Sequence, residues 1–194
     1  MTDIVKQPMT AAASVKRLMD KRKNGTLTVP LVASFAAPLQ QRQVIPRVLL
    51  LDISSSMKGR SEDPDVTRIE ALRKLVVDMK LAPGQPVYTF SYLTERCDPN
   101  HIPEPSGGTN LTGAFKKLKE DGHKSVVLIT DGEPDNPKSA LEEARGFSGL
   151  EIFYVGSGQQ PSFLKKLAKA GGGSACQVSM DPQLSATVRK LLTA

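Results

Sequence analysis

The hydrophobic pattern of the chain alternates between short unbroken apolar runs and longer stretches with apolar residues three or four positions apart. An unbroken apolar run bounded by polar residues is typical of a strand buried on both faces of a parallel sheet, although periodicity alone does not exclude a piece of buried helix. The most distinct runs cover residues 48–51 and 124–130. Further strands are predicted at residues 86–93, 150–155 and 175–179, with a short edge strand near residues 94–98.

Between these runs, apolar residues at helical spacing predict helices, and capping patterns mark where several of them begin. Thr67 and Glu70 have the spacing of a capping box. Asn136 and Asp181 are each followed by a proline, an arrangement typical of a helix N-terminus. We expect helices at residues 67–79, 111–118, 137–147 and 162–170, and a last one that begins at residue 182.

The alternation of strands and helices from residue 48 onward predicts an α/β fold, a doubly wound and mostly parallel sheet with helices on both faces. Residues 1–46 have a weaker pattern, with an amphipathic helix at about residues 10–24. We therefore predict a basic N-terminal extension over residues 1–46 and one domain over residues 47–194.

Polar residues that could bind a metal ion follow two of the predicted strands and one of the loops. Asp52, Ser54 and Ser56 come directly after the first strand, and Asp131 follows the strand at residues 124–130. Thr109 follows two glycines and precedes a helix. In open α/β sheets the carboxyl ends of the strands form the usual ligand site. These oxygen donors suit Mg²⁺, Mn²⁺ or Ca²⁺ rather than Zn²⁺ or Cu²⁺. Each motif taken singly could also be an ordinary turn without a metal.

The order Asp-x-Ser-x-Ser, Gly-Gly-Thr and Thr-Asp-Gly resembles the metal-ion-dependent adhesion site (MIDAS) of von Willebrand factor A (vWA) domains. The resemblance covers about residues 47–192 and points to an intracellular type, as in prokaryotes or phages. It implies a Rossmann-like sheet with one antiparallel edge strand and a divalent cation, Mg²⁺ or Mn²⁺ in preference to Ca²⁺. By matching positions, the residues that would hold the cation directly or through water are Asp52, Ser54, Ser56, Thr109 and Asp131.

The resemblance implies a protein-binding module without enzymatic activity, in which a partner presents an Asp or Glu side chain to the metal. Intracellular members of the family work beside ATPases or in stress-response assemblies. The alternative is a metal-dependent hydrolase or phosphotransferase that uses the same acidic residues. Against it, no His, Lys or Cys is placed as a base or nucleophile, and Ser54 stands where a dehalogenase-like phosphatase has a second aspartate. We expect Glu133 and Asp135, beside the site, to be solvated.

Charge suggests a third function, because the basic excess is confined to one end of the chain. Residues 1–47 hold eight Lys or Arg residues and two Asp residues, which accounts for the whole formal net charge of +6. This basic arm could bind nucleic acid or an acidic protein, whereas the balanced charge elsewhere does not favour a nucleic-acid surface. Cys97 and Cys176 are far apart in the sequence and form no C-x-x-C pattern, so we expect both to be free thiols. No apolar segment resembles a membrane span or a secretory signal, and we therefore expect a cytoplasmic protein.

Overall fold

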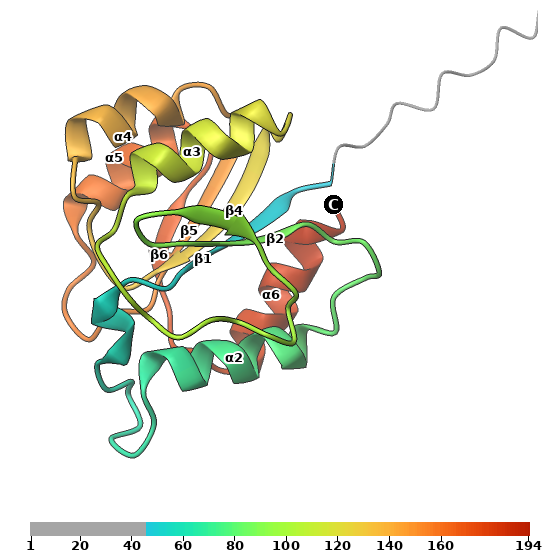
Figure 1. The fold of residues 1–194 in the computed structure, drawn as a ribbon, viewed down its shortest axis with the longest axis vertical. Helices are drawn as coiled ribbons and strands as arrows, with labels where there is room; N and C mark the ends of the chain where they lie inside the picture. Colours follow the sequence, from blue (N-terminus) through green and yellow to red (C-terminus); the bar gives the residue numbers. More distant parts are fainter. Residues whose placement is uncertain (1–45) are drawn as a thin grey trace, which may run out of the picture. The chain divides into compact units, whose positions relative to one another are not determined.

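The computed structural model describes residues 46–194, which form a six-stranded sheet between two layers of helices (Figure 1). The strand order is β3-β2-β1-β4-β5-β6, and β3 is antiparallel to β2 while every other neighbouring pair is parallel. The predicted mostly parallel sheet with one antiparallel edge strand is thus confirmed. The strands are β1 (Val48–Asp52), β2 (Val87–Phe90), β3 (Thr94–Arg96), β4 (Ser125–Thr130), β5 (Gly149–Tyr154) and β6 (Ala175–Gln177).

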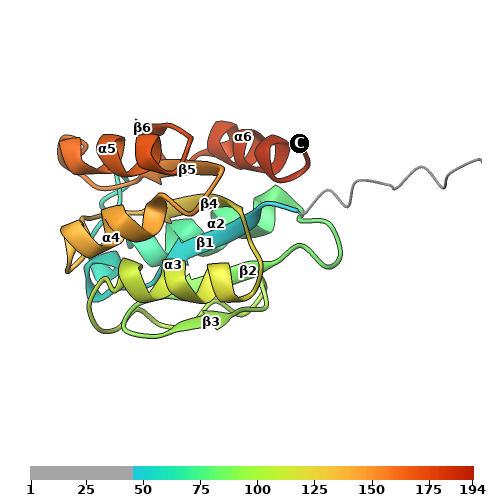
Figure 2. The same ribbon diagram turned by 90° about the horizontal axis from the view of Figure 1, so that it is seen from above.

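In the part of the chain that the structure describes, five α-helices cover the two faces of this sheet. Helices α2 (Arg68–Met79) and α6 (Pro182–Leu192) pack on one face, and α3 (Leu111–Glu120), α4 (Pro137–Ala144) and α5 (Ser162–Ala170) pack on the other (Figures 1 and 2). Alternate residues of β1 enter the two cores: Leu50 packs beneath α3, α4 and α5, whereas Leu51 faces α2 and α6. Because both faces of the strand are covered, all of its residues must be apolar except the one that enters the site.

The N-termini of the helices confirm the capping patterns of the sequence. The side chains of Thr67 and Glu70 form a complete capping box at α2. Asn136 caps α4, and Asp181 caps α6. The cap of α3 was missed: the Asn110 side chain accepts a hydrogen bond from the Gly113 amide.

Several elements differ from the prediction, in most cases because the chain turns sooner than the hydrophobic pattern indicates. Strand β2 ends at Phe90 rather than at residue 93, since the Ser91 amide donates to the Leu93 carbonyl in a tight hairpin. Helix α4 ends at Ala144 instead of residue 147. The predicted loop after β1 begins with a 3₁₀ turn, η2 (Ser55–Lys58).

Some predictions concern other parts of the chain or other properties of it. The extension over residues 1–46, with its helix at about residues 10–24, lies outside the described residues apart from its last position. Within residues 46–194, no helix has both the length and the apolar character needed to cross a membrane. Both cysteines, Cys97 and Cys176, are free thiols as predicted.

Strand β1 occupies the position in the sheet where the direction of the connections reverses. It lies between β2 and β4, so the chain first moves to one side of β1 and later crosses to the other. Helices α2 and α3, which belong to these two connections, lie on opposite faces (Figure 2). The loops at the carboxyl ends of β1 and β4 therefore separate and leave room for a ligand, as is usual in open α/β sheets.

Candidate metal centre

Asp52, the last residue of β1, is the buried base of the candidate site. Its side chain is fully enclosed, and its two oxygens accept hydrogen bonds from the Ser54 amide (2.8 Å) and from Oγ1 of Thr130 (2.6 Å). Burial raises the pKa of Asp52 to about 6, although the hydrogen bonds from Thr130 and Ser54 act in the opposite direction. This carboxyl therefore changes between its neutral and charged forms near pH 6. A nearby cation would favour the charged form.

Ser54, Ser56 and Asp131 continue from Asp52 toward the surface as a chain of hydrogen bonds. Oγ of Ser54 lies 2.9 Å from Oγ of Ser56, and Oγ of Ser56 donates to Oδ1 of Asp131 at 2.7 Å. Ser54 and Asp131 are buried, whereas Ser56, on the first turn of η2, is exposed. The structure therefore joins four of the five predicted residues in one network that opens to solvent at Ser56.

The donor atoms of this network fit a hard divalent cation. Two oxygens bound at about 2.1 Å to an octahedral Mg²⁺, at right angles to each other, lie about 3 Å apart. The two serine oxygens have that separation, 2.9 Å. Carboxylates at Asp52 and Asp131 supply negative charge on either side of the pair. Among the described residues no group of three or more His, Cys, Asp or Glu side chains is arranged to hold a metal ion.

Thr109 is brought to the same edge of the sheet, but through its backbone. Its amide donates to Oδ2 of Asp135 at 2.9 Å, and the Asp135 amide donates back to the Thr109 carbonyl at 3.0 Å. The preceding loop is also tied to the first motif, since the Ser55 amide donates to the Gly107 carbonyl. Within residues 46–194, no side-chain hydrogen bond joins Thr109 to the other four predicted residues.

Two glycines allow this loop to approach its neighbours. Gly107 has a φ of +72°, and a Cβ atom there would lie 2.5 Å from the ring of Tyr92. A Cβ atom at Gly108 would lie 2.5 Å from Oδ2 of Asp135, the atom that holds the Thr109 amide. A side chain at either position would therefore require Tyr92, Asp135 or the loop that carries Thr109 to shift.

Arg68, at the start of α2, belongs to the site although the sequence analysis did not identify it. Its Nη1 lies 2.9 Å from Oδ2 of Asp131, in an ion pair with a carboxylate that is shielded from solvent. Nη1 also donates to the Ser56 carbonyl (3.2 Å), and Nη2 donates to Oγ of Ser157 (2.9 Å). No local pattern could have revealed this residue, because it lies 63 positions before Asp131.

Asp135 corrects the expectation that it would be solvated. It is exposed, but it is not merely solvated, since Oδ2 holds the Thr109 amide. Glu133 is exposed, as expected. The two histidines lie elsewhere: His101 contacts Asp98 through Nδ1, and His123 packs edge-on against Tyr88. Neither contact brings an imidazole to the candidate metal centre.

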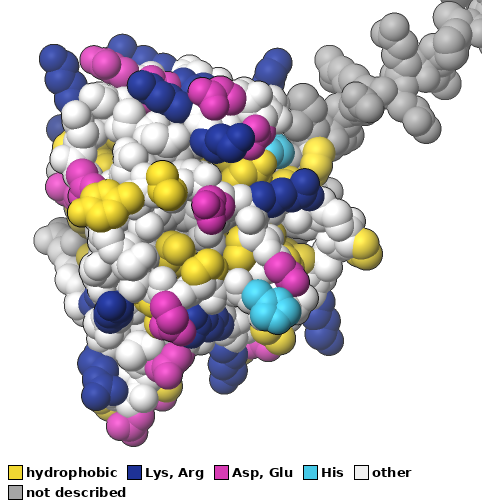
Figure 3. Space-filling model, in the orientation of Figure 1, with side chains coloured by type: hydrophobic (Ala, Val, Ile, Leu, Met, Phe, Trp, Pro, Cys, Tyr) yellow, Lys and Arg dark blue, Asp and Glu magenta, His cyan; other side chains and the backbone are white. Residues whose placement is uncertain are grey.

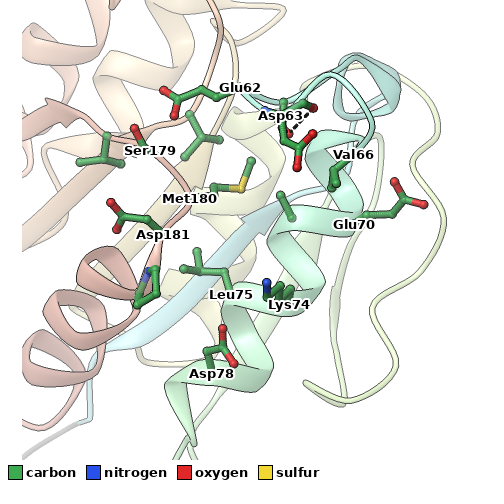
Figure 4. A pocket seen from close by; sticks show the side chains of 15 residues that line it. Glu62, Asp63, Val66, Glu70, Lys74, Leu75, Asp78, Ser179, Met180 and Asp181 are labelled. Atoms are coloured by element: carbon green, nitrogen blue, oxygen red, sulfur yellow. Dashed lines mark hydrogen bonds between the residues drawn. The ribbon is translucent and has the colours of Figure 1, made fainter.

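A groove lies beside α2, away from the network just described (Figure 4). It has a volume of about 440 Å³ and an acidic rim that includes Glu62, Asp63 and Asp78. Two further carboxylates of the rim, Glu70 and Asp181, cap α2 and α6. No histidine or cysteine lines the groove.

The surface charge does not gather into one patch on the face seen in Figure 3. Lysine and arginine side chains alternate there with aspartate and glutamate, and apolar side chains lie between them (Figure 3). A strongly basic face would be expected of a surface that binds a phosphate backbone. On this face of residues 46–194 the charges are mixed, in agreement with the balanced composition of the chain after residue 47.

Comparison with known proteins identifies the fold. No protein-family model matches the chain, and a search of curated protein sequences finds no match. Among solved structures, the manganese-loaded TRAP protein of Plasmodium vivax is similar with a TM-score of 0.54 and 19% identity over 76% of this chain and 74% of that one. A von Willebrand factor type A structure from Catenulispora acidiphila has a TM-score of 0.56 and 22% identity over 76% of this chain and 41% of that one. The six-stranded, mostly parallel sheet with one antiparallel strand and flanking helices therefore has the Rossmann-like fold of von Willebrand factor A domains.

Proposed function

We propose that the chain is a metal-dependent protein-binding module that holds Mg²⁺ or Mn²⁺ in a MIDAS. Asp52, Ser54, Ser56, Thr109 and Asp131 would hold the cation, directly or through water. An Asp or Glu side chain of a protein partner would complete the coordination from the exposed side. Such contact depends on the metal and is reversible by chelation, which suits regulated association rather than catalysis.

The observation that carries this proposal is the network from Asp52 to Asp131. It places two serine oxygens 2.9 Å apart between two carboxylates, at the carboxyl ends of β1 and β4. Ser56 is exposed while Asp52 is enclosed, so the side facing solvent is the side from which a partner could approach. The manganese-loaded state of the similar TRAP structure supports a divalent cation in this fold.

The hydrolase or phosphotransferase alternative has less support from the geometry. Its nucleophile would be Asp52, the last residue of β1, at the position that a dehalogenase-like phosphatase uses. Both oxygens of this carboxylate are engaged, by the Ser54 amide and by Thr130, and the side chain is fully buried. A nucleophile needs a free oxygen directed at the substrate, so this geometry gives Asp52 little support as a nucleophile.

The basic arm over residues 1–47 remains a separate hypothesis, since nearly all of it lies outside the described residues. Contact with nucleic acid or an acidic protein through this arm would weaken steeply with salt and survive EDTA. Contact through the metal would instead be abolished by EDTA and would depend less steeply on salt. We further propose a cytoplasmic location and a partner that belongs to an ATPase or stress-response assembly.

Thermal melting with MgCl₂, MnCl₂ or EDTA tests the metal site directly. A cation at ten times its dissociation constant adds about 1.4 kcal/mol, a rise of roughly 3–6 °C for a domain of this size. We expect this rise in the wild type and its loss in Ser54→Ala and Asp131→Asn. Asp121→Asn is the matched control, because Asp121 pairs with Lys117 and Tyr88 rather than with the site. An equal rise in all four proteins would contradict the assignment of the site.

The partner test follows from the same variants. Proteins captured by the wild type in Mg²⁺ should be released by EDTA and absent from the Ser54→Ala capture. Capture that survives EDTA but not high salt would favour the basic arm instead. Turnover of a generic phosphate ester that is abolished in Asp131→Asn would favour the hydrolase.

A further inference from the structure

Arg68 links three of the loops around the candidate metal centre through one guanidinium group. Nη1 contacts Oδ2 of Asp131 and the Ser56 carbonyl, and Nη2 donates to Ser157 in the loop after β5. The Arg68 side chain is 14% exposed, and the Asp131 side chain is fully shielded. The guanidinium therefore lies inside the wall of the site rather than on the surface.

The local structure leaves space for this arginine. Gly59 follows η2, and a Cβ atom at that position would lie 2.9 Å from Nη1 of Arg68. The Gly59 carbonyl also accepts a hydrogen bond from the Arg68 amide at 2.9 Å. The turn that carries Ser56 is thus shaped around the arginine and bound to it at both the backbone and the guanidinium.

The charges at this position balance without any metal ion. An arginine side chain remains protonated in proteins, and a shielded carboxylate is costly unless it is paired. Asp131 accepts one hydrogen bond from Ser56 at Oδ1 and one charged hydrogen bond from Arg68 at Oδ2. In the metal-free protein, Arg68 therefore supplies the positive charge that a divalent cation would otherwise supply.

We propose that Arg68 is an internal counter-cation that competes with the divalent cation for Asp131 and so lowers the metal affinity of the site. This inference rests on the proposed function, because it concerns the same metal. A divalent ion in reach of Asp131 is repelled by the guanidinium beside it, or must displace it. In either case, the ion pair with Arg68 partly neutralises the negative charge with which Asp131 would attract the metal.

The same contacts connect metal binding to the surrounding loops. If the guanidinium moves away from Asp131, its hydrogen bonds to the Ser56 carbonyl and to Ser157 are weakened at the same time. The metal-free and metal-bound forms would then differ in how tightly η2, the start of α2 and the loop after β5 are joined. A weakly held metal would bind more tightly when a partner's carboxylate adds its own charge, so the metal and the partner would each favour binding of the other.

The test compares Mn²⁺ binding by the full chain in Arg68→Gln and in Arg73→Gln, measured by calorimetry at neutral pH. Arg73 is the matched control, since it lies on the same helix and pairs with Glu104 at 2.7 Å, outside the site. We expect Arg68→Gln to bind Mn²⁺ roughly tenfold more tightly than the wild type, the scale of one charged hydrogen bond. Arg73→Gln should bind with the affinity of the wild type.

Melting separates this effect from a purely structural one. In EDTA, Arg68→Gln should melt below the wild type, because Asp131 loses its counter-charge. In saturating Mn²⁺ the difference should shrink, since the metal replaces that charge. A merely structural arginine would lower both melting temperatures by the same amount, and that result would overturn the inference.

Equal Mn²⁺ affinities for the wild type and Arg68→Gln, or a weaker affinity in the variant, would also overturn the inference while leaving the proposed function intact. No Mn²⁺ binding by any of the proteins would remove both. Ser157→Ala is a second variant in case Arg68→Gln does not fold, because it removes one anchor of the guanidinium at an exposed residue. Tighter Mn²⁺ binding by Ser157→Ala supports the inference, and unchanged affinity contradicts it.

Discussion

Thr109 and Asp135 are joined by two reciprocal hydrogen bonds, one from each backbone amide. One of these bonds ends on the Asp135 carboxylate and the other on the Thr109 carbonyl, so the loop before α3 is fixed to the loop after β4. The position of Thr109 therefore depends on a residue that would not itself contact the metal.

Replacing Asp135 should weaken metal binding without unfolding the protein. Asp135→Ala removes the acceptor of the Thr109 amide, and loss of a supporting residue of this kind typically costs ten- to hundredfold in metal affinity. Calorimetric titration with Mn²⁺ measures the effect. Glu133→Ala is the control, since this exposed neighbour carries the same charge and should change the affinity little.

Gly107→Ala should lower the free energy of unfolding for two reasons. The positive φ costs about 1–2 kcal/mol for a residue with a side chain, and the new Cβ atom would press on the ring of Tyr92. Gly84→Ala separates these terms, because Gly84 has a φ of +83° and no atom within 4 Å of the position of its Cβ. In urea denaturation Gly107→Ala should lose more stability than Gly84→Ala; equal losses would mean that the Tyr92 contact is easily relieved.

Metal affinity should fall as the pH is lowered through about 6, because the cation favours the charged form of Asp52 and the pKa of this buried group is about 6. In EDTA, the stability of the metal-free protein depends on pH in the opposite direction. The pKa of Asp52 is higher in the folded protein than in the unfolded chain, so this residue contributes stability at low pH that is lost as the pH rises toward 6. Titrations and melts at several pH values test both statements. Asp52→Asn should abolish the contribution in EDTA, whereas Asp121→Asn should preserve it.

Thr130→Val should move the pH dependence of metal binding to higher pH. The Thr130 hydroxyl donates to Asp52 at 2.6 Å and lowers the pKa of that carboxyl, and valine has nearly the same shape without the hydroxyl. The midpoint of Mn²⁺ affinity against pH is the measurement. Thr89→Val, at a buried threonine of β2 on the other side of β1, should leave the midpoint where it is in the wild type. A midpoint that moves equally in both variants would refute the role of this bond.

The sequence predicts those parts of the fold that depend on short-range patterns. The run at residues 48–51 predicts β1 because both faces of that strand are buried, and Thr67 with Glu70 predicts the start of α2 because a capping box is local. The hydrophobic pattern extends β2 too far, since Tyr92 and Leu93 are strand-forming residues that the hairpin leaves exposed.

The sequence predicts only those site residues that belong to the recognised motifs. Asp52, Ser54, Ser56 and Asp131 meet because strands β1 and β4 are neighbours, which follows from the fold class; that they bind a cation stays a prediction. The supporting contacts of Arg68 and Asp135 span 63 and 26 residues of sequence, and neither residue type stands out in its own segment. Such contacts arise only when the loops are folded together.

The short strands at the two edges of the sheet have a consequence for self-association. Strands β3 and β6 have three residues each, and most of their side chains are exposed, Glu95 and Arg96 among them. A long, flat and apolar edge is what another chain needs in order to extend a sheet into a ladder. With edges this brief and partly charged, neither side of the sheet is a good template for fibril growth or for the addition of a foreign strand.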